Sequence, residues 1–103
     1  MRVMKPGLRL KSAVCATEVM VIRAPPGAAQ LSCGGVEMLI AGEMAPADAR
    51  LDPALAQGSL IGKRYVDAEE RYELLCTKGG EGALSLDGTP LAVKQAKALP
   101  SSD

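Results

Sequence analysis

The sequence contains no histidine, no phenylalanine and no tryptophan among its 103 residues. Histidine is the commonest general base, the commonest metal ligand among side chains and the usual partner of a nucleophilic serine or cysteine. Its absence excludes most familiar hydrolase and metalloenzyme designs. We therefore assign no catalytic residue from the sequence and favour a protein that is not an enzyme.

The only aromatic residues are Tyr65 and Tyr72, so aliphatic side chains must fill the core. Aromatic side chains bury about 150–250 Å² each and dominate the energetics of cores and interfaces. A core built without them is expected to be thin. Association with a second copy or with a partner protein is one natural remedy.

The chain also lacks an excess of charge, since its 12 basic and 12 acidic residues cancel. Without a basic block or a row of aromatic residues, nucleic-acid binding is disfavoured. No apolar run approaches the roughly 20 residues of a membrane-spanning helix, and the first residues lack the apolar stretch of a signal peptide. Three cysteines, an odd number, disfavour a disulfide framework. These features predict a bacterial-type cytoplasmic protein with reduced thiols.

What the sequence does contain is short segments with a period of two. Leu8 and Leu10 share one face of a predicted strand, and residues 17–23 are apolar on both faces, which predicts a central strand covered on both sides. We predict an all-β fold, a small antiparallel meander of about seven short strands closing into a barrel or a sandwich. Residues 1–94 form its single domain, and 95–103 form a polar C-terminal tail.

Two tight hairpins are predicted from pairs of turn residues between alternating apolar runs. Gly34-Gly35 and Asp87-Gly88 both suit a type I′ turn, whose two central residues have positive φ. The first turn makes Cys33 and Val36 the pair that closes the hairpin. On this interpretation Cys33 is a small hydrophobic residue at a corner.

Residues 41–61 are rich in alanine and proline and have no clean period, so we predict a long loop containing at most one helical turn. Asp52 would cap that turn, with Pro53 at its first position and Gly58 just beyond its end. Long loops in compact domains are often functional. Its apolar residues are the predicted contacts with a partner protein, namely Met44, Pro46, Leu51 and Leu55.

The three cysteines, Cys15, Cys33 and Cys76, are far apart and include no C-x-x-C pair. Structural zinc usually has four cysteine or histidine ligands in close pairs, so we predict no metal and place all three thiols in strands, as core residues. The alternative is that they converge within about 4 Å to bind a soft metal or a small electrophile. A reactive cysteine would need a lowered pKa, which we expect only an arginine or lysine to supply.

The remaining motifs indicate no cofactor. The glycine-rich stretches 33–38 and 78–82 lack the spacing of nucleotide-binding loops. The charged residues around 64–71 are expected to form a solvated hairpin tip.

Our first hypothesis is a non-catalytic accessory or assembly subunit that acts through protein–protein contacts, as a homo-oligomer or with another chain. The alternative is a thiol-based protein that binds a soft metal or a small ligand, and a small-ligand pocket inside the barrel stays open as a third.

Overall fold

The computed structural model describes residues 2–94, in which the regular elements are β-strands and one short 3₁₀ helix. The strands form three antiparallel sheets, which confirms the predicted all-β class. Within the described residues no helix is both long enough and apolar enough to cross a membrane. The predicted tail, 95–103, lies outside the described residues.

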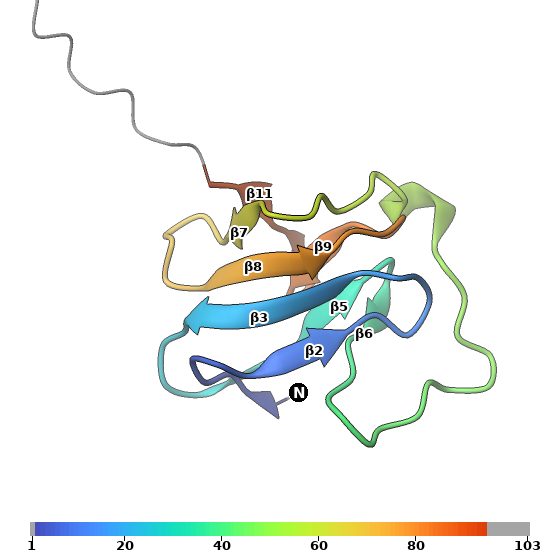
Figure 1. Ribbon diagram of the computed structural model, residues 1–103, viewed down its shortest axis with the longest axis horizontal. Coiled ribbons are helices and arrows are strands. Elements are labelled where there is room, and N and C mark those ends of the chain that lie inside the picture. The colour runs from blue at the N-terminus through green and yellow to red at the C-terminus, as the bar shows by residue number, and fades with distance from the viewer. Residues whose placement is uncertain (1, 95–103) are drawn as a thin grey trace, which may run out of the picture.

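Two larger sheets build the molecule, and Figure 1 shows β8, β3 and β2 side by side with β5 and β6 behind them. The five-stranded sheet has the order β11 (Ala92–Val93), β7 (Arg64–Val66), β8 (Glu73–Lys78), β3 (Glu18–Arg23) and β2 (Arg9–Lys11). The four-stranded sheet has the order β10 (Thr89–Pro90), β9 (Leu84–Leu86), β5 (Leu31–Cys33) and β6 (Val36–Glu37). A small third sheet pairs β1 (Arg2–Val3) with β4 (Ala28–Ala29), and the 3₁₀ helix η1 spans Pro53–Leu55.

The two larger sheets are joined at two places but pack as a sandwich. Lys11 and Leu39 exchange two backbone hydrogen bonds of 2.8 Å, which ties β2 to the residues after β6. On the other side, the chain leaves β10 on one sheet and enters β11 on the other. The contact at Lys11 is an isolated bridge, and across residues 2–94 no continuous ladder closes a barrel.

The core lies between the sheets and is aliphatic, as the composition requires. Val19 and Val21 of β3 are 1% exposed, and both tyrosines are buried beside this aliphatic cluster. The opposite face of β3 differs from its prediction, because Met20 and Ile22 are only half-buried. The prediction of a strand covered on both sides was wrong, since a two-layer sandwich covers one face of each sheet.

Both predicted hairpins are present. Gly34 and Gly35 have φ of 63° and 89°, and Cys33 pairs with Val36 across them. Asp87 and Gly88 have φ of 49° and 84° in the turn that joins β9 to β10. Positive φ at both central positions is the requirement from which these hairpins were predicted.

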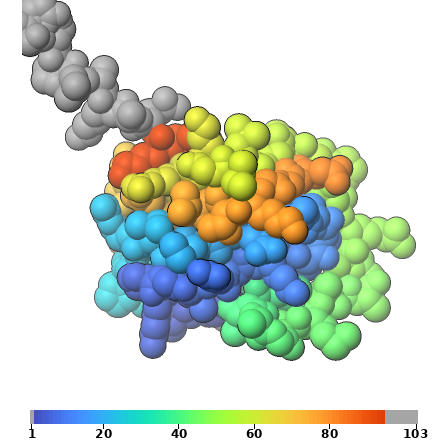
Figure 2. Space-filling model, viewed as in Figure 1, coloured from blue at the N-terminus to red at the C-terminus, as the bar shows by residue number. Residues whose placement is uncertain are grey.

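The predicted long loop, 41–61, contains η1 as its only helical turn, and Figure 2 shows its green atoms along one end of the molecule. The Asp52 side chain accepts a hydrogen bond from the Ala54 N–H at 2.9 Å, which is the predicted cap. Two backbone hydrogen bonds of 2.9 Å hold this region to the sheets: Asp52 N–H donates to Gly34 O, and Ala83 N–H donates to Leu55 O.

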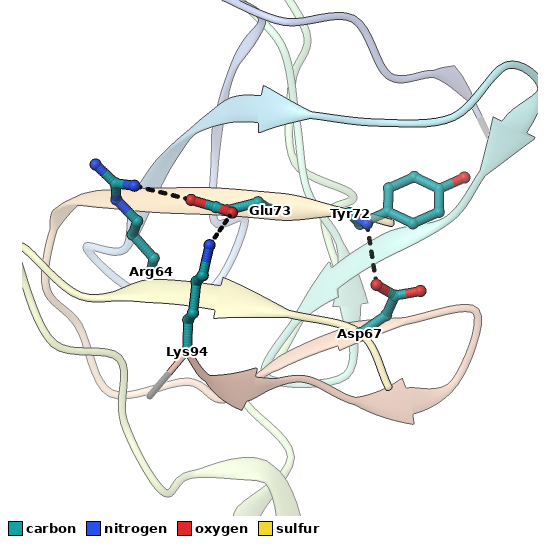
Figure 3. A network of polar contacts seen from close by, with 5 residues as sticks. All are labelled: Arg64, Asp67, Tyr72, Glu73 and Lys94. Atoms are coloured by element: carbon teal, nitrogen blue, oxygen red, sulfur yellow. Dashed lines mark hydrogen bonds and ion pairs between the residues drawn. The ribbon is translucent and has the colours of Figure 1, made fainter. Parts of the chain in front are cut away.

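A buried carboxylate links β8, the central strand of the five-stranded sheet, to β7 and to the residue that follows β11 (Figure 3). Glu73 on β8 is 1% exposed and accepts hydrogen bonds of 3.0 Å from Arg64 of β7 and from Lys94, which follows β11. The Lys94 hydrogen bond outweighs the effect of burial and, with Arg64, lowers the pKa of the Glu73 carboxyl. The prediction of a solvated tip fits the exposed pair of Arg71 and Glu69, whereas Arg64 pairs with a buried residue.

Candidate functional site

The loop between β2 and β3 presents a cysteine in a fixed position. The Ser12 hydroxyl oxygen accepts hydrogen bonds of 3.1 Å from the backbone N–H groups of Val14 and Cys15. The Ser12 N–H donates to the Thr17 carbonyl at 2.8 Å, which closes the loop at its base. Serine favours such turns because its side chain can bond to nearby backbone groups. The prediction that Cys15 lies in a strand was therefore wrong.

This loop brings Cys15 against Cys33. Their sulfur atoms are 3.7 Å apart, although the two residues are 18 positions apart in the chain. Cys33 ends β5 and is 0% exposed, whereas Cys15 is partly exposed. The result is a pair of free thiols in which one residue is partly exposed and the other is fully buried.

Three polar groups surround the sulfur of Cys15. The hydroxyl oxygens of Ser12 and Thr17 lie at 3.2 Å and 3.3 Å, and the backbone N–H of Gly82 donates to this sulfur at 3.4 Å. A hydroxyl oxygen has two lone pairs and one proton. Because two backbone N–H groups occupy the lone pairs of the Ser12 oxygen, its proton can be donated to the sulfur once Cys15 is ionised. The arrangement therefore favours a thiolate at Cys15.

The ionisation of the two thiols is driven in opposite directions. Burial by itself would raise the pKa of Cys15, but the hydrogen bonds from Ser12, Thr17 and Gly82 lower it to about 6. Burial raises the pKa of Cys33 to about 11, and negative charge on Cys15 contributes to the same effect. Cys15 is therefore the thiol of the pair that ionises at the lower pH, and the Cys33 thiol, which keeps its proton, can donate it to the neighbouring sulfur.

Glycines are required around this pair. A Cβ atom at Gly82 would lie 2.8 Å from the Cys33 sulfur, and one at Gly80 would lie 2.5 Å from the Thr17 nitrogen. Real Cβ atoms do not approach other atoms this closely, so the backbone between β8 and β9 reaches the thiols only because these residues have no side chain. The Ser59 hydroxyl donates to the Gly82 carbonyl at 2.6 Å and holds this segment in place.

Cys76 does not complete a three-thiol cluster. It is buried on β8, and its thiol donates to the Lys78 carbonyl at 3.2 Å. Burial is the largest cause of its raised pKa, with a smaller effect from Cys15. Within residues 2–94, no group of three or more Cys, His, Asp or Glu side chains is placed to hold a metal ion.

The predicted partner contacts fall into two groups. Met44 is 89% exposed, and Pro46 is also exposed. Leu51 and Leu55 are half-buried, with Leu51 packed over Gly34 and Leu55 near Gly35. Met44 and Pro46 are therefore the more exposed of the four, and the role of all four as partner contacts stays a prediction.

Sequence reasoning missed four residues that define the thiol site, namely Ser12, Thr17, Gly80 and Gly82. It expected that only arginine or lysine would lower the pKa of a cysteine here, whereas two hydroxyls and one backbone amide do so. The available signal was the spacing S-x-x-C-x-T in residues 12–17.

Comparison of the chain with protein-family models, with curated proteins and with solved structures finds no match.

Proposed function

We propose that this chain is a thiol–disulfide redox protein that cycles between the reduced pair and a disulfide joining Cys15 to Cys33. One observation supports the proposal above the others: the two sulfurs are 3.7 Å apart, and they belong to a partly exposed residue, Cys15, and a fully buried one, Cys33. This division suits an attacking thiol that meets a substrate and a resolving thiol that meets only its neighbour.

The chemistry has two steps. The Cys15 thiolate attacks one sulfur of a disulfide substrate, which forms a mixed disulfide and releases one substrate thiolate. Cys33 then attacks the Cys15 sulfur, forms the internal disulfide and releases the second substrate thiol. The substrate gains the two electrons that the protein loses, and the Cys33 proton leaves with the second thiol.

The internal disulfide requires a small movement. An S–S bond is about 2.05 Å long, so the sulfurs must approach each other by about 1.7 Å. Cys33 is held in β5 by neighbouring strands on both sides, whereas Cys15 lies in a loop. We expect the loop of residues 12–17 to supply the movement.

The test is reaction of the fully reduced protein with oxidised glutathione, followed by intact mass spectrometry and peptide mapping. Wild type should lose the mass of two hydrogen atoms through a Cys15–Cys33 bond, Cys33→Ser should retain a mixed disulfide at Cys15, and Cys15→Ser should stay reduced. Cys76→Ser is the matched control and should behave as wild type.

The pH dependence of the attacking thiol is measured in Cys33→Ser, where the rate of Cys15 alkylation should increase with pH through a midpoint of about 6. A disulfide that requires Cys76, or no disulfide, contradicts the proposal.

A soft metal ion is a second candidate for the same pair. Two metal–sulfur bonds of about 2.3 Å spanning the 3.7 Å separation enclose an angle of about 107°, close to tetrahedral. The hydroxyls of Ser12 and Thr17 are the nearest further donors. Native mass spectrometry after addition of Zn²⁺ tests this candidate. Zinc retained by wild type and by Cys76→Ser, but lost from Cys15→Ser, favours it. Bare protein in all three samples rejects it.

A further inference from the structure

The donor groups around Cys15 indicate which oxidant this pair meets. We propose that its substrate is a small hydroperoxide, which the Cys15 sulfur attacks beside the hydroxyls of Ser12 and Thr17 and the N–H of Gly82. This inference rests on the proposed function, because the product of the attack is resolved by Cys33.

The leaving group of the attack favours a hydroperoxide over a disulfide. Attack on a peroxide O–O bond expels a hydroxide or alkoxide, on which negative charge is concentrated, and fixed hydrogen-bond donors stabilise such developing charge. A disulfide expels a thiolate, a soft anion that needs such donors less. The hydroxyls of Ser12 and Thr17 lie 3.2 Å and 3.3 Å from the attacking sulfur, within reach of an oxygen that approaches it.

These donors are preorganised. The Ser12 oxygen is fixed by the N–H groups of Val14 and Cys15, which both bond to it at 3.1 Å, so its proton stays on the side of the Cys15 sulfur, where an approaching peroxide oxygen also lies. Thr17 is 0% exposed, and the Gly82 carbonyl is held by Ser59. Donors that are already in place cost no reorganisation when the charge develops.

The surroundings of Cys15 favour a small substrate. Cys15 is only partly exposed, and the backbone of Gly82 bonds directly to its sulfur. Val14, the residue beside Cys15, packs toward Gly34, where a Cβ atom would lie 3.0 Å from it. A substrate with one or two heavy atoms at its reactive end fits this setting better than a disulfide, which carries a substituent on each sulfur.

The Cys15 thiolate attacks the terminal oxygen of ROOH, so that an S–O bond forms, the O–O bond breaks, and the released alkoxide takes a proton from water. Cys15 is now a sulfenic acid, oxidised by two electrons. Cys33 attacks the Cys15 sulfur, the S–S bond forms, and hydroxide leaves with the Cys33 proton as water. Two molecules of a small external thiol then restore the reduced pair by exchange and leave as their own disulfide.

The experiment compares two oxidants on the same reduced protein. Oxidation by hydrogen peroxide and by oxidised glutathione is followed by stopped flow over a range of pH. The pKa of Cys15 is measured in each variant by alkylation, and rates are compared per thiolate, so that a change in this pKa does not affect the comparison. We expect wild type to react with peroxide at least about tenfold faster than free cysteine does. In Cys33→Ser, dimedone should label a sulfenic acid at Cys15.

Thr17→Val removes one donor hydroxyl while keeping the side-chain shape. It should slow the reaction with peroxide about tenfold and change the reaction with oxidised glutathione less than about threefold. Thr77→Val is the matched control, since Thr77 is exposed on β8 and bonds only to the Glu18 carbonyl, and it should change neither rate. Circular dichroism establishes that both variants fold, and the wild-type comparison does not depend on either.

The outcomes separate the two proposals. If peroxide reacts at the rate of free cysteine while glutathione exchange still forms the Cys15–Cys33 bond, the hydroperoxide inference is wrong and the redox function stands. If neither oxidant forms that bond, both are wrong. Equal slowing of both oxidants in Thr17→Val also overturns the inference, because the hydroxyl would then act on the sulfur alone.

Discussion

Cys15 and Glu73 both have lowered pKa values, and in each case neighbours that the fold supplies cause the shift. Cys15 is made acidic by uncharged donors, without a cation or a helix N-terminus beside it. Glu73 is kept ionised in a buried position by Lys94 and Arg64. The first arrangement favours ionisation of a partly exposed cysteine, whereas the second links β8 to β7 and to the residue after β11.

At this scale we predict that Glu73→Gln destabilises the fold by about 1–2 kcal/mol at pH 7, since two hydrogen bonds to a charged group are lost and both cations can still be solvated. The folded-state pKa of Glu73 is lowered, so its stabilisation is complete above the unfolded value of about 4.3 and is lost as the pH falls through the folded value. Urea unfolding at pH 7 and at pH 3 measures both effects.

Glu69→Gln is the matched control for that measurement. Glu69 pairs with Arg71 at 3.3 Å, with both side chains largely exposed, so its replacement should change stability by less than about 0.5 kcal/mol. Equal losses in the two variants, or a loss in Glu73→Gln that persists unchanged at pH 3, contradict the role assigned to Glu73.

At the scale of elements, the hairpin turns determine where the thiol pair lies. The Gly34-Gly35 turn ends β5 at Cys33, and the turn at Asp87 holds β9 against β5. Asp87 has two roles in the second turn. Its backbone has φ of 49°, and its carboxylate accepts a 2.8 Å hydrogen bond from the Gln30 N–H.

We therefore predict that Asp87→Ala costs about 1–2 kcal/mol, because alanine disfavours positive φ and leaves the Gln30 N–H without its partner. Asp87→Asn should stay within about 0.5 kcal/mol of wild type, since asparagine tolerates this conformation and keeps a side-chain oxygen. Thermal and urea unfolding of the three proteins measure the difference. Similar stability of the two variants would show that neither the positive φ of Asp87 nor its hydrogen bond with Gln30 stabilises the turn.

At the scale of the whole molecule, several large apolar side chains remain at the surface. Leu60 and Ile61, adjacent in the chain, are 60% and 68% exposed, and Met44 is more exposed than either. Single exposed apolar residues are common, whereas neighbouring ones suit a contact with another protein. The accessory or assembly role expected from the sequence stays a prediction, and these residues are where we expect such contacts.

For this role we predict that the purified protein sediments at a mass above the 10.7 kDa of one chain at micromolar concentrations. Leu60→Glu combined with Ile61→Glu should return it to a monomer, because burial of two carboxylates in an interface is costly. Ala68→Glu, on an exposed turn, serves as the control. Sedimentation equilibrium measures the mass, and a monomeric wild type at all concentrations contradicts self-association.

The sequence by itself determined the class of fold and its turns. Alternating residues predict strands because side chains alternate across a strand, and Gly34-Gly35 and Asp87-Gly88 predict hairpins because few residues adopt positive φ. Asp52 predicts a capped helical turn for an equally local reason. Each of these inferences depends on residues within a few positions of one another, and each is found in the structure.

The thiol site was decided by tertiary structure alone. Cys15, Cys33 and Gly82 come from a loop, a strand end and a glycine-rich connection on different parts of the chain, and no local pattern shows that they meet. The environment of Glu73 has the same origin. Its carboxylate can be buried because the fold brings Arg64 and Lys94, from other parts of the chain, within 3.0 Å of it. Strand register and sheet packing set these contacts, and both depend on the whole chain at once.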